Sequence, residues 1–129
     1  MPELSYVNVF ARDVEALARF YIEVFDFAEI TEIRTPIFRG VRTGKSAIGF
    51  NAHEAYALLQ LDDEADTRGV KFLLNIEVDH PADVDRLVPL AVTKGASLIK
   101  EPNKTYYNWY QAVLRDPEGN IFRINKVLD

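Results

Sequence analysis

Near the N-terminus, an alternating pattern of apolar residues gives way to a helical one. Residues 4–11 are rich in Tyr, Val and Phe and predict a strand with Tyr6, Asn8 and Phe10 on one face. From Val14 onward, apolar residues recur at three- and four-residue steps, which predicts a helix as far as about residue 25. Asp13 fits the N-cap of this helix, because its carboxylate can accept hydrogen bonds from the free N–H groups of the first turn.

Three short apolar segments follow this helix and predict a meander of strands at residues 29–35, 38–43 and 47–51. Turn-forming residues separate them. We therefore assign residues 1–51 to a first module. Residues 52–69 read as a connection that contains a short helix over 53–59 and an acidic surface run over 62–66.

The same order of elements then repeats. Residues 72–78 predict a strand on which Leu73, Asn75 and Glu77 share a face. A helix is predicted from Pro81, a favourable first helical residue, to a left-handed stop at Gly95. Pro89 lies inside this helix and is predicted to bend or interrupt it. Strands at 97–100, 110–115 and 121–125 complete a second module over residues 70–129, and a tight turn over 116–120 joins the last two strands.

The repeated order of strand, helix and three strands predicts the architecture. We expect an α+β fold in which two βαβββ modules form a curved mixed sheet around a central cleft, with the helices outside. The modules and their connection would make one compact domain.

The composition of the chain argues against several classes of function. The chain has 129 residues, a net charge of −5 and no cysteine, so disulfides, thiolate metal sites and a cysteine nucleophile are excluded. The acidic balance argues against a nucleic-acid partner. Apolar runs fall short of the ~20 residues that span a bilayer, and the N-terminus lacks a signal pattern, so we expect a cytoplasmic protein with no membrane partner.

Two motifs point to a family. Residues 9–13, followed by Phe20-Tyr21, Val24-Phe25 and Phe27, resemble the strand-to-helix signature of the vicinal oxygen chelate superfamily. That superfamily contains glyoxalase I, the bleomycin-resistance proteins and the extradiol dioxygenases. Asn108-Trp109 ahead of residues 115–120 resembles the matching signature of the second module. The resemblance covers nearly the whole chain and implies a homodimer.

The resemblance also implies where a metal would be held. Enzymes of the superfamily usually bind one divalent ion through two side chains from each module, and the matching positions here are Tyr6, Gly49, Leu73 and Arg123. None of these four is a usual ligand for a divalent metal ion. We therefore expect no metal and no other cofactor.

Strand alternation instead predicts an aromatic and amide lining for the cleft, suited to a small organic ligand that is anionic or aromatic. The side chains predicted to face the interior are Tyr6, Asn8, Phe10, Asn51, Leu73, Asn75, Glu77, Arg123 and Asn125. Tyr107 and Trp109 belong to a cluster with Tyr106 and Tyr110 that could stack on a ligand or pack in a core or dimer interface.

Two pairing alternatives stay open for the polar residues. Asn8 and Asn75 could bond to each other across the pseudo-twofold axis. Arg123 could pair with Glu77, or it could meet a ligand carboxylate or phosphate through a bidentate fork.

The main functional hypothesis is a module that binds a small organic molecule without the family metal. The alternatives are enzymes: a metal-dependent lyase of the glyoxalase type, a dioxygenase with rearranged ligands, or a metal-free isomerase with Glu77 as base and Tyr6 as proton donor. A scaffold with a vestigial cleft is a third class. The ligand's identity stays open, as does the choice between pairing of the modules within a chain and swapping across a dimer.

Overall fold

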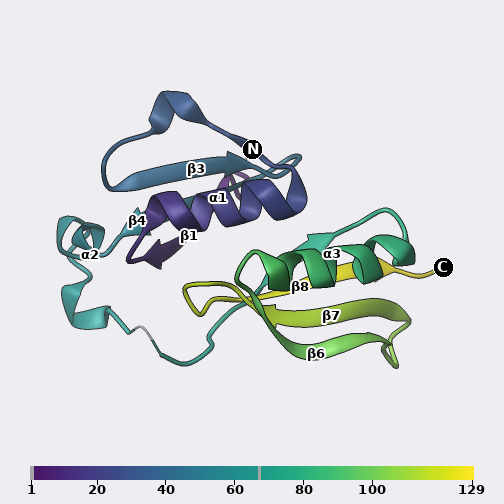
Figure 1. Ribbon diagram of the computed structural model, residues 1–129. Helices are drawn as coiled ribbons and strands as arrows, with labels where there is room; N and C mark the ends of the chain where they lie inside the picture. Colours follow the sequence, from purple (N-terminus) through teal and green to yellow (C-terminus); the bar gives the residue numbers. More distant parts are fainter. Residues whose placement is uncertain (1, 67) are drawn as a thin grey trace. The chain divides into compact units, whose positions relative to one another are not determined.

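The computed structural model describes residues 2–66 and 68–129. The chain forms two compact units, residues 1–69 and 70–129. Each unit has a four-stranded mixed sheet with one long helix packed on it (Figure 1). Among the described residues, no helix combines the length and apolar character needed to cross a lipid bilayer.

The first unit confirms the predicted strand and helix at its start. Its sheet has the order β1-β4-β3-β2, with β1 parallel to β4 and the other pairs antiparallel. Asp13 caps the long helix, its Oδ1 accepting from the Ala16 N–H at 3.0 Å. The elements are β1 (Tyr6–Ala11), α1 (Val14–Phe25), β2 (Ala28–Glu29), β3 (Phe38–Arg42) and β4 (Ala47–Ala52).

Alternation along β1 and β4 divides the first sheet into two different faces. One face packs on α1, where the buried Tyr21 and Phe50 rings stack with centroids 5.5 Å apart. The opposite face carries Asn8 and Asn51, which share a side because Asn8 pairs with Gly49, two residues before Asn51. This second face is the one that the sequence assigned to a ligand.

The strand predicted over residues 29–35 is wrong for most of its length. Only Ala28–Glu29 pair as β2, and Thr31–Ile33 form a 3₁₀ turn, η1. Arg34 folds back onto Glu29 through two hydrogen bonds of 2.7 Å, so a local ion pair closes the turn. Ile33 then lies over Gly40, since a Cβ on that glycine would be only 2.8 Å from Ile33 Cδ1.

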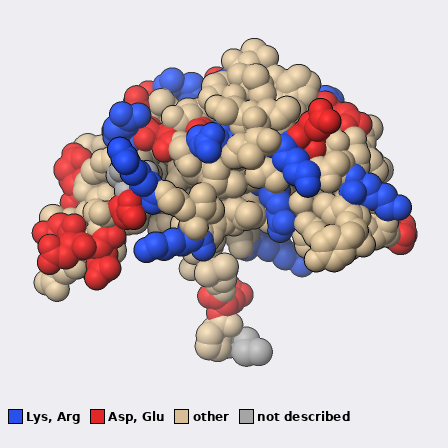
Figure 2. Space-filling model, turned by 90° about the horizontal axis from the view of Figure 1, so that it is seen from below, with Lys and Arg blue, Asp and Glu red and all other residues tan. Residues whose placement is uncertain are grey.

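The connection contains the expected short helix, α2 (Glu54–Leu58), followed by a 3₁₀ turn, η2 (Asp62–Glu64). Residues 61–66 are all exposed, as predicted for an acidic surface run. Figure 2 shows Asp and Glu side chains gathered at the left edge of the view.

The second unit repeats the order of the first. Its sheet has the order β5-β8-β7-β6, with β5 parallel to β8. Its first strand is shorter than predicted, so Leu73 precedes it, and β6 is longer and bulged. The elements are β5 (Leu74–Glu77), α3 (Pro81–Thr93), β6 (Ser97–Lys104), β7 (Trp109–Arg115) and β8 (Ile121–Val127).

The predicted interruption of the second helix at Pro89 is wrong, because α3 continues through it to Thr93. Pro89 lies on the exposed side of the helix, where water can bond the carbonyl that loses its N–H partner. The buried side is carried by Val84, Leu87, Val88 and Ala91. Gly95 has the predicted positive φ, +116°, just after the helix.

Candidate functional site

The four predicted site residues of the first unit lie on one open sheet face. Asn51 Nδ2 donates to Asn8 Oδ1 at 3.1 Å. A pairing of Asn8 with Asn75 of the second unit stays a prediction. The Phe10 ring stacks on Tyr56 from α2 with centroids 4.0 Å apart. Tyr6 is half-buried at the start of the same strand. Asn8, Phe10 and Asn51 therefore have partners within their own unit.

One face of the second sheet packs on α3, and the opposite face is the open face of this unit. The open face carries a polar row that crosses all four strands. Strand register places Glu77 beside Asn125, Asn125 beside Gln111, and Gln111 beside Asn103. Asn125 Nδ2 donates to Glu77 Oε1 at 2.8 Å, and the Val127 N–H donates to Glu77 Oε2 at 2.8 Å. Both carboxylate oxygens of Glu77 are thereby bound to β8.

Arg123 lies two residues before Asn125 on β8, on the same face as the row. Its Nε donates to Asn75 Oδ1 at 2.9 Å, and its Cζ lies 5.5 Å from the centroid of the Trp109 ring. Glu77 is not its partner, so that predicted ion pair is wrong. The reason is register, because β5 pairs Asn75 rather than Glu77 with Arg123.

Only two of the four clustered aromatics belong to this face. Tyr107 meets Trp109 edge to face with centroids 5.2 Å apart, and its hydroxyl accepts from Gln111 Nε2 at 3.0 Å. Tyr110 points to the other side and donates to Asp85 Oδ1 of α3 at 2.6 Å, a bond that raises the pKa of Tyr110. Tyr106 is 99% exposed.

Two amide oxygens in the polar row lack partners. Gln111 Oε1 and Asn125 Oδ1 are buried, and neither accepts a hydrogen bond from any described residue. Asn125 is 0% and Gln111 6% exposed. The sequence analysis placed Asn125 on this face but did not single out Gln111, which lies in the strand predicted at 110–115. The signal that could have found it is its alternation with Trp109 and Val113, which both face the same side.

Leu73 contributes least among the predicted site residues of the second unit. It stands before β5 and is 38% exposed. Asn75, Glu77, Tyr107, Trp109 and Arg123 are brought together on one sheet face. Whether they share a cleft with the residues of the first unit stays a prediction.

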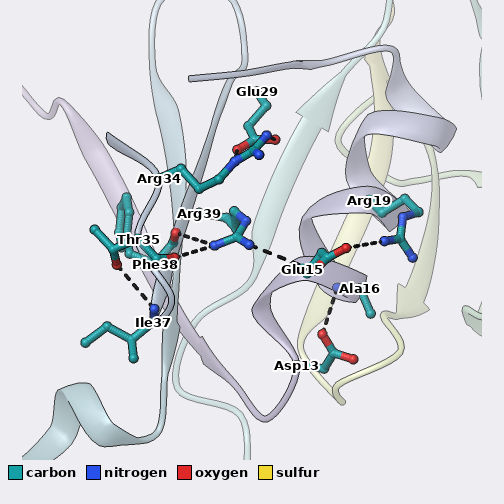
Figure 3. A network of polar contacts seen from close by, with 10 residues as sticks. All are labelled: Asp13, Glu15, Ala16, Arg19, Glu29, Arg34, Thr35, Ile37, Phe38 and Arg39. Carbon is teal, nitrogen blue, oxygen red and sulfur yellow. Dashed lines mark hydrogen bonds and ion pairs between the residues drawn. The ribbon is translucent and has the colours of Figure 1, made fainter. Parts of the chain in front are cut away.

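A cavity of about 220 Å³ lies in the first unit, lined by residues of α1 and of the segment from β2 to β3. Figure 3 shows its charged side chains paired with one another: Arg34 with Glu29 at 2.7 Å, Arg19 with Glu15 at 2.8 Å, and Arg39 with Glu15 at 3.9 Å. The Arg34 hydrogen bonds lower the pKa of Glu29. Because these charges satisfy each other, the cavity is a weaker candidate than the face of the second unit.

Comparison with known proteins decides the family. The model of the glyoxalase/bleomycin resistance protein/dioxygenase superfamily matches residues 3–124. The chain belongs to this superfamily. This confirms the resemblance found in the two sequence motifs.

Solved structures of other proteins agree with the fold. A glyoxalase/bleomycin resistance protein/dioxygenase family enzyme from Burkholderia phytofirmans PsJN is 62% identical, with 98% of this chain and 100% of that chain covered and a TM-score of 0.95. The lactoylglutathione lyase of Agrobacterium tumefaciens is 17% identical, with 98% and 94% covered and a TM-score of 0.69. TioX from Micromonospora sp. ML1 is also 17% identical, with 98% and 100% covered and a TM-score of 0.67. No curated protein matches the chain.

The residues at the four positions that the resemblance assigns to a metal do not fit a divalent ion. A side chain at Gly49 would place its Cβ 2.2 Å from Asn8 Oδ1 and 2.9 Å from the Phe38 ring. Arg123 would bring a permanent cation to another of the four positions. Among residues 2–66 and 68–129, no group of three or more His, Cys, Asp or Glu side chains is placed to hold a metal ion.

The contact at Gly49 gives a direct prediction. We expect Gly49→Ala to lower the free energy of unfolding by about 1–3 kcal/mol, because the new methyl group overpacks the sheet face. Urea denaturation measures this loss. In an Asn8→Ala background the same substitution should cost less, since one of the two colliding groups is gone. An equal cost in both backgrounds would show that Asn8 does not restrict the position.

Proposed function

We propose that this protein binds a small organic molecule with an anionic group on the open face of the β5-β8-β7-β6 sheet, without the superfamily's metal. The observation that carries the proposal is Arg123. Its side chain is half-buried, and no carboxylate within the described ranges lies within ion-pair distance of it.

The surroundings of Arg123 support an anion receptor. Asn75 fixes Nε, and the Trp109 ring supports the guanidinium plane, so the side chain is held in one orientation. The two terminal nitrogens remain for a carboxylate or phosphate, which a guanidinium binds through two parallel hydrogen bonds. A guanidinium that is partly removed from water gains most from such a partner.

Glu77 fits a positioning role better than the role of a general base. Both of its oxygens accept hydrogen bonds from β8, which hold the carboxylate against its own sheet. The isomerase alternative requires Glu77 to take a proton from a substrate. Glu77 instead holds the Asn125 amide in a fixed orientation, which supports binding over proton transfer.

The test compares benzoate with its neutral isostere benzamide in ¹H–¹⁵N NMR titrations followed at the Trp109 indole N–H. We expect benzoate to bind the wild-type protein more tightly, and Arg123→Ala to weaken benzoate binding by roughly 10–100-fold, the loss of a charge-assisted pair. Arg123→Lys should recover only part of the affinity, because an ammonium lacks the fork.

Arg86→Ala provides the matched control. Arg86 carries the same charge on α3 and is paired with Asp83 at 3.3 Å, so its loss should not change benzoate binding. Equal affinity of Arg123→Ala and wild-type protein for benzoate would refute the proposal. Binding that is lost with chelator and restored by Mn²⁺, Fe²⁺, Ni²⁺ or Zn²⁺ would instead support the lyase or dioxygenase alternative.

The superfamily resemblance also supports a homodimer, which we propose as the working form. Sedimentation equilibrium measures the mass directly. A monomer at all concentrations would contradict this part of the proposal.

A further inference from the structure

The two unpaired oxygens of the polar row lie on neighbouring strands. Gln111 of β7 and Asn125 of β8 are direct partners in the antiparallel register, so their side chains stand next to each other on the same face. Buried polar atoms nearly always have a hydrogen-bond partner, and each exception requires an explanation. Here two exceptions of the same kind, both acceptors, occur side by side.

The orientation of the Asn125 amide is set by its neighbour. An ionised carboxylate has no proton to donate, so Glu77 can act only as an acceptor. The Asn125 amide nitrogen must therefore face Glu77, and the Asn125 amide oxygen must face away from it. The Gln111 nitrogen is engaged by the Tyr107 hydroxyl, which leaves its oxygen free. The surrounding hydrogen bonds thus use both amide nitrogens and leave two acceptors.

We propose that Asn125 Oδ1 and Gln111 Oε1 form an acceptor pair that receives an N–H₂ group of the ligand whose anionic end meets Arg123. This inference rests on the function proposed above and narrows the ligand class. An amino or primary amide group carries two protons, one for each oxygen. A water molecule offers the same two protons, so the probes must distinguish a ligand amino group from bound water.

The two ends of this ligand are recognised on the same face of the same strand. Arg123 and Asn125 are two residues apart on β8, so both side chains stand on one side of the sheet. The ligand class is therefore a small acid that carries an amino or primary amide group at the end opposite its carboxylate or phosphate. Tyr107, which is 39% exposed and bonded to Gln111 through its hydroxyl, is the side chain that would move to admit the donor group.

Three probes of nearly the same size test this class on the wild-type protein. 4-Aminobenzoate has both ends, 4-methylbenzoate lacks the donor, and 4-aminobenzamide lacks the anion. We expect 4-aminobenzoate to bind about tenfold more tightly than 4-methylbenzoate, the difference typical of one or two hydrogen bonds to otherwise unpaired groups. The side-chain amide signals of Gln111 and Asn125 should shift with 4-aminobenzoate and stay in place with 4-methylbenzoate.

Variants separate the two proposals. Gln111→Met keeps the side-chain length without the acceptor, and it should lower the ratio of the two benzoate affinities, because only Asn125 Oδ1 then remains to accept from the amino group. Arg123→Ala should weaken both benzoates together and leave their ratio unchanged. Arg86→Ala should leave both affinities and their ratio as in the wild-type protein.

Each outcome decides one proposal. If both benzoates bind with equal affinity, the acceptor pair is refuted and water or a turned Gln111 amide satisfies the oxygens, while the role of Arg123 stands. If neither benzoate binds better than 4-aminobenzamide, the anion-binding function itself fails. The comparison of probes on the wild-type protein gives this answer even if Gln111→Met does not fold.

Discussion

Phe122→Ala is expected to lower the free energy of unfolding by about 3–5 kcal/mol, the usual cost of removing a fully buried aromatic ring. Phe122 is 0% exposed in the middle of β8, on the side that packs against α3. The substitution leaves a cavity that the surrounding sheet and helix cannot fill completely. Its effect reaches the candidate site, because Arg123 and Asn125 stand on the opposite face of the same strand.

Trp109 is the single tryptophan of the chain and lies in the second unit, so its fluorescence during guanidinium denaturation reports on this core directly. Tyr106→Ala is the control, since Tyr106 is 99% exposed and its removal should have little effect. A loss below about 1 kcal/mol for Phe122→Ala would show that the core of the second unit is not packed as described.

Asp116→Ala is expected to cost about 2–4 kcal/mol, because several donors lose a charged acceptor at once. Asp116 is only 3% exposed in the turn between β7 and β8. Its Oδ1 accepts from the Glu118 N–H at 2.9 Å and from the Asn120 N–H at 3.0 Å, and the Asn120 side chain donates to its Oδ2 at 3.1 Å. Without the carboxylate, the turn that fixes the register of the two strands loses the acceptor of these three hydrogen bonds.

Thermal denaturation followed by circular dichroism measures this loss. Asp116→Asn should be milder, since its amide oxygen can still accept from the two backbone N–H groups. If Asp116→Ala were as stable as Asp116→Asn, the turn would be held by its backbone hydrogen bonds and by the positive φ of Gly119, +93°, alone.

Much of the fold could be predicted because it depends on local signals. The apolar period of residues 14–25 and the cap at Asp13 define α1 by themselves, and the repeated order of elements defines both units. The predictions that are wrong concern segments where side-chain contacts or exposure override a local backbone preference. The Glu29–Arg34 ion pair closes a turn inside a predicted strand, and the exposure of Pro89 lets α3 continue.

For the candidate site, the sequence alone determined which residues share a face. Alternation placed Asn75, Glu77, Arg123 and Asn125 on one side of the second sheet, because successive side chains of any strand point to opposite faces. The two superfamily motifs also assign Tyr6 and Arg123 to metal positions by resemblance, and that assignment stays a prediction.

Only the tertiary structure decided which of these residues meet. The parallel register of β5 and β8 places Arg123 beside Asn75 and Glu77 beside Asn125. The antiparallel register of β7 and β8 places Gln111 beside Asn125. Strand order and register join residues that are far apart in the chain, and no local pattern encodes them. For that reason the two unpaired acceptor oxygens became visible only after the strands were placed side by side.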